Sequence, residues 1–292
     1  MNSAAALKGV KKEIDDFRLG PIDLEIEAGF VTALVGRNGA GKSTLLKILM
    51  NLVKQNEGSV AFFGQTLDGE SEDWKTKVAY MPQSYPGPLP FTGQELKKLT
   101  ANWHPHWDEQ WFQQMVEHFQ IPLEKKFEKL SQGVQQKLKF ALTVARNPQL
   151  LILDEPTSHV DIPSKKQMID FLIDWLEQED SRTILLATHQ VEDIRKLADY
   201  LVILDDGGFL GKYDKDELTA QYKRYWIEGN LPTATVPGEL ERGKGVIATK
   251  CARQAEDFLR KRGITWSSAV PLELDEVISI KLMKKKNTAL KS

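Results

Sequence analysis

The segment "VTALVGRNGAGKST", residues 31–44, decides how this chain must fold. It begins with five apolar or β-branched residues, which is typical of a buried strand, and continues into a glycine-rich turn. Residues 36–44 fit the pattern G-x-x-x-x-G-K-[S/T] of a phosphate-binding loop, and a helical pattern over residues 43–52 follows at once. A strand, a glycine-rich loop and a helix in this order predict an α/β fold with a nucleotide site.

The loop itself supplies the groups that a polyphosphate needs. Its glycines let backbone N–H groups face the phosphates, and the dipole of the following helix adds to the attraction. Lys42 is expected to reach the β- and γ-phosphates, and Ser43 to bind Mg²⁺. The predicted nucleotide-binding residues of the loop are Gly36, Arg37, Asn38, Gly39, Ala40, Gly41, Lys42, Ser43 and Thr44.

Further apolar runs place this loop in a sheet. They lie at residues 59–63, 78–81, 150–153, 183–187 and 201–204. Runs of this length, bounded by Gly, Pro or Asp, predict buried strands. Between them, residues 164–178 put apolar side chains on one face of a helix, with Asp161 as its cap and Pro163 in its first turn. Strands that alternate with helices predict a mainly parallel sheet.

Four polar residues stand where these strands end. They are Asp154 and Glu155 in "LLILDEP", Gln83 in "VAYMPQ" and His189 in "TILLATH". The carboxyl ends of parallel strands converge on one ligand crevice. There Asp154 suits an Mg²⁺ ligand and Glu155 suits a base that polarises an attacking water. Taken singly, Gln83 and His189 are equally well explained as structural residues. For the acidic pair, a solvated turn after a core strand is the less favoured alternative.

Two regions depart from the alternation of strands and helices. A proline-rich loop and an aromatic, helix-like stretch begin at residue 84, which predicts a helical subdomain over about residues 84–147 within a domain of residues 1–220. After residue 220, prolines and glycines punctuate the chain, and helical patterns follow at residues 253–262 and 274–284. This composition predicts a small accessory domain over residues 221–292.

Composition narrows the class of protein. The 292 residues are 41% hydrophobic and 27% charged, which is ordinary for a globular protein, and a net charge of −2 argues against nucleic acid as the main partner. Cys251 is the single cysteine, so no intrachain disulfide forms and a reducing compartment is expected. Because no apolar run approaches the roughly 18–20 residues that cross a bilayer, we expect any membrane-spanning part to belong to another chain.

The motifs together resemble the ATP-binding subunits of ABC transporters. The likeness rests on "GRNGAGKST", "MPQ", "LSQGVQQ", "LLILDEPTSHVD" and "ATH", in that order, and covers about residues 7–220. It implies a P-loop ATPase with a mainly parallel core sheet, an antiparallel β subdomain and a helical subdomain, here with a small α+β extension. It also implies that ATP, bound with Mg²⁺, is hydrolysed between two subunits that face each other head to tail.

The resemblance assigns a role to each polar residue. It makes Glu155 the catalytic base, lets Gln83 contact Mg²⁺ or water, and lets His189 hold the γ-phosphate. It places Ser131 and Gly133, from the loop "LSQGV", on ATP held by a second ATP-binding subunit, either identical or different. Asp161 is then the aspartate of the dimer interface.

The chain departs from the family pattern in two places. In the loop at residues 130–134, the pattern L-S-G-G-Q becomes L-S-Q-G-V, and the valine removes one polar contact to ATP. The aromatic residue that stacks on adenine should fall near residues 13–14, where none is present. We expect the nearby Phe17 to point into the sheet instead.

The partner implied is a separate integral membrane subunit. Residues 107–133 and 271–285 resemble bacterial ABC-2-type systems, which include bacitracin-type exporters and Ytr-type systems. In those systems a coupling helix enters a groove next to the helical subdomain. Here the groove is expected to be lined by parts of residues 85–92 and by Trp103, Trp107 and Trp111. The alternative is that these tryptophans fill the core of the helical subdomain.

These likenesses predict an ATPase subunit of an exporter, cytoplasmic and peripheral at the inner face of the cell membrane. Two alternatives remain open: a soluble ABC ATPase that acts on nucleic acid or ribosomes, and a subunit of an importer. The role of the C-terminal extension is also open, between a regulatory module and passive dimer packing.

Overall fold

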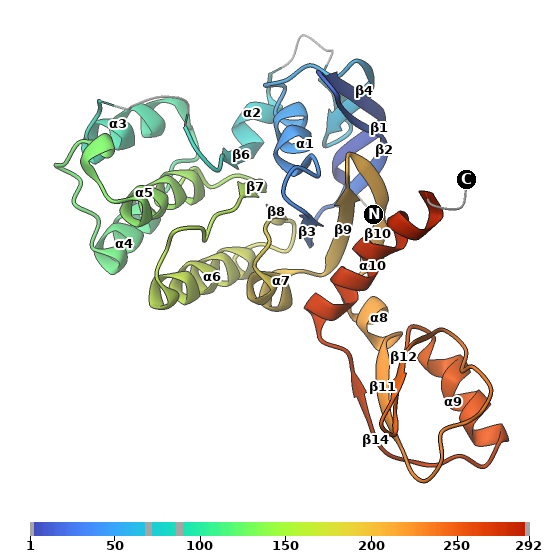
Figure 1. The fold of residues 1–292 in the computed structure, drawn as a ribbon. Coiled ribbons are helices and arrows are strands. Elements are labelled where there is room, and N and C mark those ends of the chain that lie inside the picture. Colours follow the sequence, from blue (N-terminus) through green and yellow to red (C-terminus); the bar gives the residue numbers. More distant parts are fainter. Residues whose placement is uncertain (1–2, 68–71, 86–89, 290–292) are drawn as a thin grey trace. The chain divides into compact units, whose positions relative to one another are not determined.

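A computed structural model describes residues 3–67, 72–85 and 90–289, and the chain divides into two compact units, Met1–Lys212 and Tyr213–Ser292 (Figure 1). This boundary lies a few residues before residue 220, where the sequence places it. The segment after residue 212 contacts the C-terminal unit, since the ammonium of Lys281 lies 3.9 Å from the centroid of the Tyr213 ring. The backbone carbonyls of Gln221 and Tyr222 accept from the N–H groups of Ala252 and Leu272, each at 3.0 Å.

A six-stranded sheet forms the centre of the first unit. Its order is β10-β9-β3-β8-β7-β6. The strands are β3 (Val31–Gly36), β6 (Val78–Met81), β7 (Leu150–Asp154), β8 (Thr183–Ala187), β9 (Tyr200–Asp205) and β10 (Gly208–Asp214). The five strands from β9 to β6 are parallel, which confirms the predicted α/β class.

Both faces of this sheet are covered, as the apolar runs predict. The helices of this part are α1 (Lys42–Leu49), α2 (Trp74–Lys77), α6 (Ile162–Glu177) and α7 (Val191–Leu197). Alternate residues of β7 enter different cores: Leu150 and Ile152 pack in the core that contains α1, and Leu151 and Leu153 pack in the core that contains α6. The predicted cap of α6 is confirmed, since the Asp161 carboxylate accepts from the Ser164 N–H at 2.9 Å.

A second, antiparallel sheet lies over the face that α1 covers. Its order is β2-β1-β4-β5, built from β1 (Ser3–Ile14), β2 (Phe17–Glu27), β4 (Glu57–Phe62) and β5 (Gln65–Thr66). Strands β1 and β2 form a hairpin in which Ile14 pairs with Phe17. This hairpin places the start of β2 next to the glycine-rich loop, which becomes important for the site.

A group of helices follows β6 and precedes β7 in the chain (Figure 1). It contains α3 (Gly93–Trp103), α4 (Glu109–Phe119), the 3₁₀ turn η1 (Phe127–Lys129) and α5 (Gln132–Val144). Helix α3 begins with a capping box between Thr92 and Glu95, and α4 begins where Asp108 accepts from the Trp111 N–H at 2.8 Å. Phe112, Met115 and Phe140 are fully buried in the core that these helices share with α6.

The C-terminal unit is a small α+β fold. Its elements are α8 (Lys215–Ala220), β11 (Lys223–Ile227), β12 (Glu239–Gly243), β13 (Val246–Thr249), α9 (Ala252–Lys261), β14 (Trp266–Pro271) and α10 (Leu274–Ala289). The strands form an antiparallel sheet in the order β12-β13-β11-β14. Tyr225, Ile247, Ala255 and Leu259 form its core against α9. Among the residues that the structure describes, no helix has the length and apolar character needed to cross a membrane.

Candidate active site

The glycine-rich loop leaves β3 at Gly36 and enters α1 at Lys42. Gly39 and Gly41 take left-handed conformations, with φ of 79° and 100°, which residues with a side chain rarely adopt. Gly41 also lies against β2, because a Cβ atom there would come within 2.9 Å of the Phe17 ring. The Lys42 ammonium turns back over the loop and donates to the carbonyls of Gly36 at 2.7 Å and Arg37 at 3.2 Å.

Lys42 is largely buried and lies near two carboxylates. It is 7% exposed, and burial lowers the pKa of its ammonium, while the negative charges of Glu155 and Asp154 oppose that shift. The loop thus presents one cation and several backbone N–H groups beside two anions. A polyphosphate and a divalent cation together would balance these charges.

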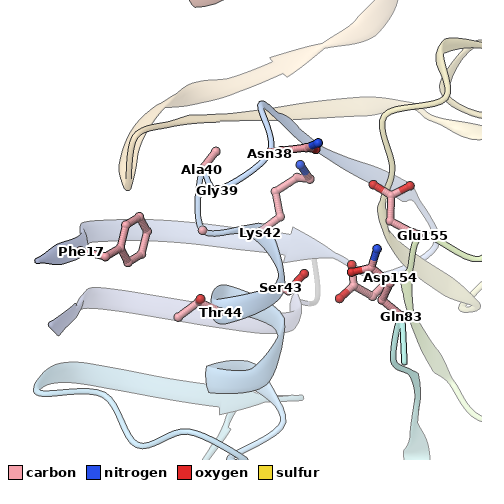
Figure 2. A pocket seen from close by; sticks show the side chains of 11 residues that line it. Phe17, Asn38, Gly39, Ala40, Lys42, Ser43, Thr44, Gln83, Asp154 and Glu155 are labelled. Carbon is pink, nitrogen blue, oxygen red and sulfur yellow. The ribbon is translucent and has the colours of Figure 1, made fainter. Parts of the chain in front are cut away.

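A cavity of about 510 Å³ opens between the loop and the strand ends (Figure 2). It is lined by Phe17, Asn38, Gly39, Ala40, Gly41, Lys42, Ser43, Thr44, Gln83, Asp154 and Glu155. The structure therefore brings most of the residues predicted from the loop together with three of the four predicted at strand ends. Gly36 and Arg37 do not line the cavity, and their carbonyls hold Lys42 instead.

Asp154 has the surroundings of a ligand for a hard cation. Burial and the neighbouring charge of Glu155 raise the pKa of its carboxyl, while a hydrogen bond from Ser43 and the charge of Lys42 lower it. Its Oδ1 atom is buried and has no hydrogen-bond partner. Mg²⁺ prefers oxygen ligands, and in nucleotide sites it is bound by one or two carboxylates, the phosphates and several other oxygen ligands such as water. Ser43, Asp154 and the Gln83 amide oxygen fit this requirement.

Glu155 follows Asp154 but faces another way. Its φ is 50°, a left-handed conformation that is costly for a residue with a side chain, and its N–H donates to the Ala187 carbonyl of β8 at 2.8 Å. The buried carboxylate lies with Oε2 at 2.8 Å from Nδ1 of His189. This contact does not have hydrogen-bond geometry, since Oε2 has no hydrogen-bond partner. His189 is 57% exposed, so it reaches the site from its rim.

Comparison with known proteins agrees with this arrangement. Residues 19–158 match the family model described as "ABC transporter". The zinc uptake ATP-binding protein ZnuC of Bacillus subtilis (strain 168) is 30% identical, over 65% of this chain and 85% of that protein. This chain belongs to the ABC transporter ATP-binding family. It is an ABC-type ATPase, which binds ATP and couples its hydrolysis to transport.

Two further proteins are similar to this chain, one over nearly its whole length and one in its fold. The ABC transporter ATP-binding protein YtrB of Bacillus subtilis (strain 168) is 27% identical, over 94% of this chain and 97% of that protein. A solved structure described as the dimeric, post-hydrolysis state of the ATP-binding cassette MJ0796 bound to ADP and Pi shares the fold. Its TM-score is 0.61 at 22% identity, and the match covers 72% of this chain and 98% of that one.

The loop "LSQGV" at residues 130–134 does not line the cavity of its own chain. Ser131 is the N-cap of α5 and accepts from the Val134 N–H at 3.4 Å, so this loop forms the start of a helix. A Cβ atom on Gly133 would approach the His159 carbonyl oxygen to 2.9 Å, so the helix start lies close against the segment after β7. Asp161, the predicted interface residue, caps α6 and lies 3.2 Å from the ammonium of Lys137.

One expectation about the site holds only in part. The half-buried ring of Phe17 packs against the core and also lines the cavity (Figure 2). A Cβ atom on Gly41 would come within 2.9 Å of this ring. Sequence reasoning also missed Gln136, whose buried amide donates to the carbonyls of Glu155 and Pro156, both at 2.8 Å. The signal for Phe17 was its place directly after the two-residue β1–β2 turn, at the first position of β2. Gln136 carried no signal, since its partners are distant in sequence.

Proposed function

We propose that this chain is the ATPase subunit of an ABC-2-type exporter and acts on a separate membrane-spanning subunit at the inner face of the cell membrane. The observation that carries the proposal is the match to YtrB, which runs nearly end to end and includes the C-terminal unit. The match to ZnuC covers only 65% of this chain. The likeness of residues 107–133 and 271–285 to ABC-2-type systems supports the same conclusion.

In the proposed reaction, the loop around Lys42 binds the phosphates of ATP, and Glu155 accepts the proton of the attacking water. His189, at the rim beside Glu155, binds the γ-phosphate. Ser43, Asp154 and Gln83 would hold Mg²⁺, which neutralises charge on the phosphates when bound. Each of these side chains lines the cavity or contacts one that does.

The proposal includes a second ATP-binding subunit. Ser131 and Gly133 lie at the start of α5, where Ser131 is exposed and neither residue reaches the cavity of its own chain. A helix start with free N–H groups suits a phosphate. The related cassette MJ0796 is described as a dimer, which supports a site completed by the loop of a neighbouring subunit.

The membrane partner would dock on the helical subdomain. Trp107 and Trp111 pack against the core of the helical subdomain, which was the alternative to lining the groove. Trp103, in contrast, is 77% exposed. Leu99 on the same helix is 47% exposed and Phe91 is 41% exposed. We therefore propose that these three side chains form the docking surface. Residues 86–89 of the expected groove lie outside the described part of the chain.

Affinity purification tests this proposal. The tagged Glu155→Gln chain would be recovered with Mg²⁺ and ATP from gently solubilised membranes of its own organism, and the bound proteins identified by mass spectrometry. We expect a polytopic membrane protein and no extracellular solute-binding protein. Recovery of a solute-binding protein would favour the importer that the likeness to ZnuC suggests. Recovery of ribosomes or nucleic acid without a membrane protein would contradict the proposal.

A further inference from the structure

A lysine of α5 reaches into the segment that carries Gln83. The Lys139 ammonium donates to the backbone carbonyl of Gln83 at 2.8 Å and to that of Pro82 at 3.4 Å. Lys139 is 5% exposed, and it lies over the ring of Tyr85 at 5.8 Å from the centroid. Charge-assisted hydrogen bonds in a buried site are among the stronger ones, so this contact fixes the backbone that follows β6.

The other end of β6 is held by the same helix region. Arg146, just beyond α5, donates from Nη2 to the carbonyl of Val78 at 3.0 Å. Strand β6 is at the edge of the six-stranded sheet, so among the described residues β7 is its one neighbouring strand. Two cations therefore attach this edge strand, at its first residue and just past its last, to the helix that begins at Ser131.

Stability alone does not explain a lysine at this position. Burial lowers the pKa of the Lys139 ammonium to about 8, while the charge of Asp154 opposes the shift. A buried charge of this kind costs desolvation free energy, and an apolar residue of similar volume often serves a core as well or better. What the ammonium adds is a defined position for the two carbonyls that it binds.

We propose that Lys139 is a positioning residue for ATP hydrolysis: it holds the backbone at Pro82 and Gln83 so that the Gln83 side chain stays in the nucleotide cavity. It also ties Gln83 to the helix that starts at Ser131, so a movement of that helix displaces Gln83. This inference rests on the proposed role of Gln83 at Mg²⁺ or the attacking water.

A double-mutant cycle tests the inference, with Lys139→Met, Gln83→Ala and the combined variant of the full-length protein. Lys139→Met keeps the length of the side chain and removes the charge and the donors. We expect it to lower kcat for ATP by about 10- to 100-fold, because a misplacement of about 1 Å in an active site costs that much, with KM for ATP changed less than about threefold. In the Gln83→Ala background, Lys139→Met should lower kcat no further.

Two controls separate positioning from a general loss of structure. Lys166→Met removes an exposed lysine of α6 and should keep wild-type kcat. Lys139→Arg keeps a cation with several donors and should restore kcat to within about fivefold of wild type. If Lys139→Met does not fold, as judged by thermal unfolding, Lys139→Arg and Lys139→Gln are compared in the same cycle. Glutamine retains a donor without the charge, and its loss of kcat should vanish in the Gln83→Ala background.

The outcomes are distinguishable. If Lys139→Met keeps the wild-type kcat while Gln83→Ala has a lowered kcat, the inference is overturned and the proposed role of Gln83 stands. The inference is also overturned if the fold-loss of kcat in the combined variant equals the product of the two single losses, since Lys139 then does not act through Gln83. Wild-type kcat in Gln83→Ala overturns the proposed role of Gln83 and this inference with it.

Discussion

Glu155 occupies a left-handed conformation at the end of β7, which separates its carboxylate from that of Asp154 (Figure 2). The two neighbouring carboxylates can then take the different roles proposed for them, Asp154 at Mg²⁺ and Glu155 at the attacking water. Glu155→Gln keeps the shape of the side chain but removes the proton acceptor. We expect ATP binding to persist and turnover to fall by about 10²–10⁴-fold.

Blocked hydrolysis should also retain the ATP-bound dimer of Glu155→Gln. Size-exclusion chromatography with light scattering should show a dimer with Mg²⁺ and ATP, and a monomer after ATP is removed. Glu177→Gln, which changes an exposed carboxylate of α6, is the matched control and should behave as the wild type. Normal turnover in Glu155→Gln would remove this residue from the role of base.

Phe17 is the aromatic ring best placed for the adenine of ATP. It lies at the start of β2, lines the cavity and contacts Gly41 of the loop. Stacking of a base on an aromatic ring contributes roughly 1–3 kcal/mol, so Phe17→Ala should raise the Kd for ATP about 5- to 150-fold. Phe17→Trp should keep the affinity. Binding of inorganic triphosphate, which has no base, should be the same in all three proteins, and an equal loss for triphosphate would contradict stacking.

At the scale of elements, the sequence predicted those strands and helix ends that are determined by residues close together in the chain. The apolar runs of β3, β7 and β8 and the cap and proline of α6 are local patterns, and each is found within about a residue of its predicted place. The direction of the Phe17 ring depends on the hairpin of β1 and β2 and on their packing against the loop. The role of Lys139 depends on a carbonyl 56 residues earlier, which no local pattern can show.

The start of α6 makes a prediction about pH. Hydrogen bonds from the N–H and hydroxyl of Ser164, with a smaller contribution from Lys137, lower the pKa of the Asp161 carboxyl to about 2. Because the folded pKa lies below the unfolded value of about 3.9, the carboxylate stabilises the fold above pH ~4, and this contribution is lost as the pH falls towards 2. The side chain is 57% exposed, so solvent screening keeps the effect modest.

Comparison of the wild type with Asp161→Asn and Asp161→Ala measures this effect without ATP. Asparagine remains a good N-cap, whereas alanine should lower the free energy of unfolding by about 0.5–2 kcal/mol at pH 7. In urea unfolding at pH 7, 5 and 3, the advantage of Asp161 over Asp161→Asn should be largest at pH 7 and shrink towards pH 3. An advantage that grows as the pH falls would contradict the assigned pKa.

At the scale of the whole molecule, the separation of Ser131 from its own cavity predicts complementation between two inactive variants. Lys42→Ala removes the phosphate contact of one subunit, and Ser131→Arg blocks the loop offered to its neighbour. Each variant alone should lose most ATPase activity. In a mixed dimer, Lys42 of one chain and Ser131 of the other remain together in one of the two sites. An equal mixture should therefore recover about a quarter of wild-type activity if subunits exchange freely in a symmetric dimer. Activity that stays at the level of the separate variants would show that copies of this chain do not share a site, and would leave a different ATP-binding subunit as the partner.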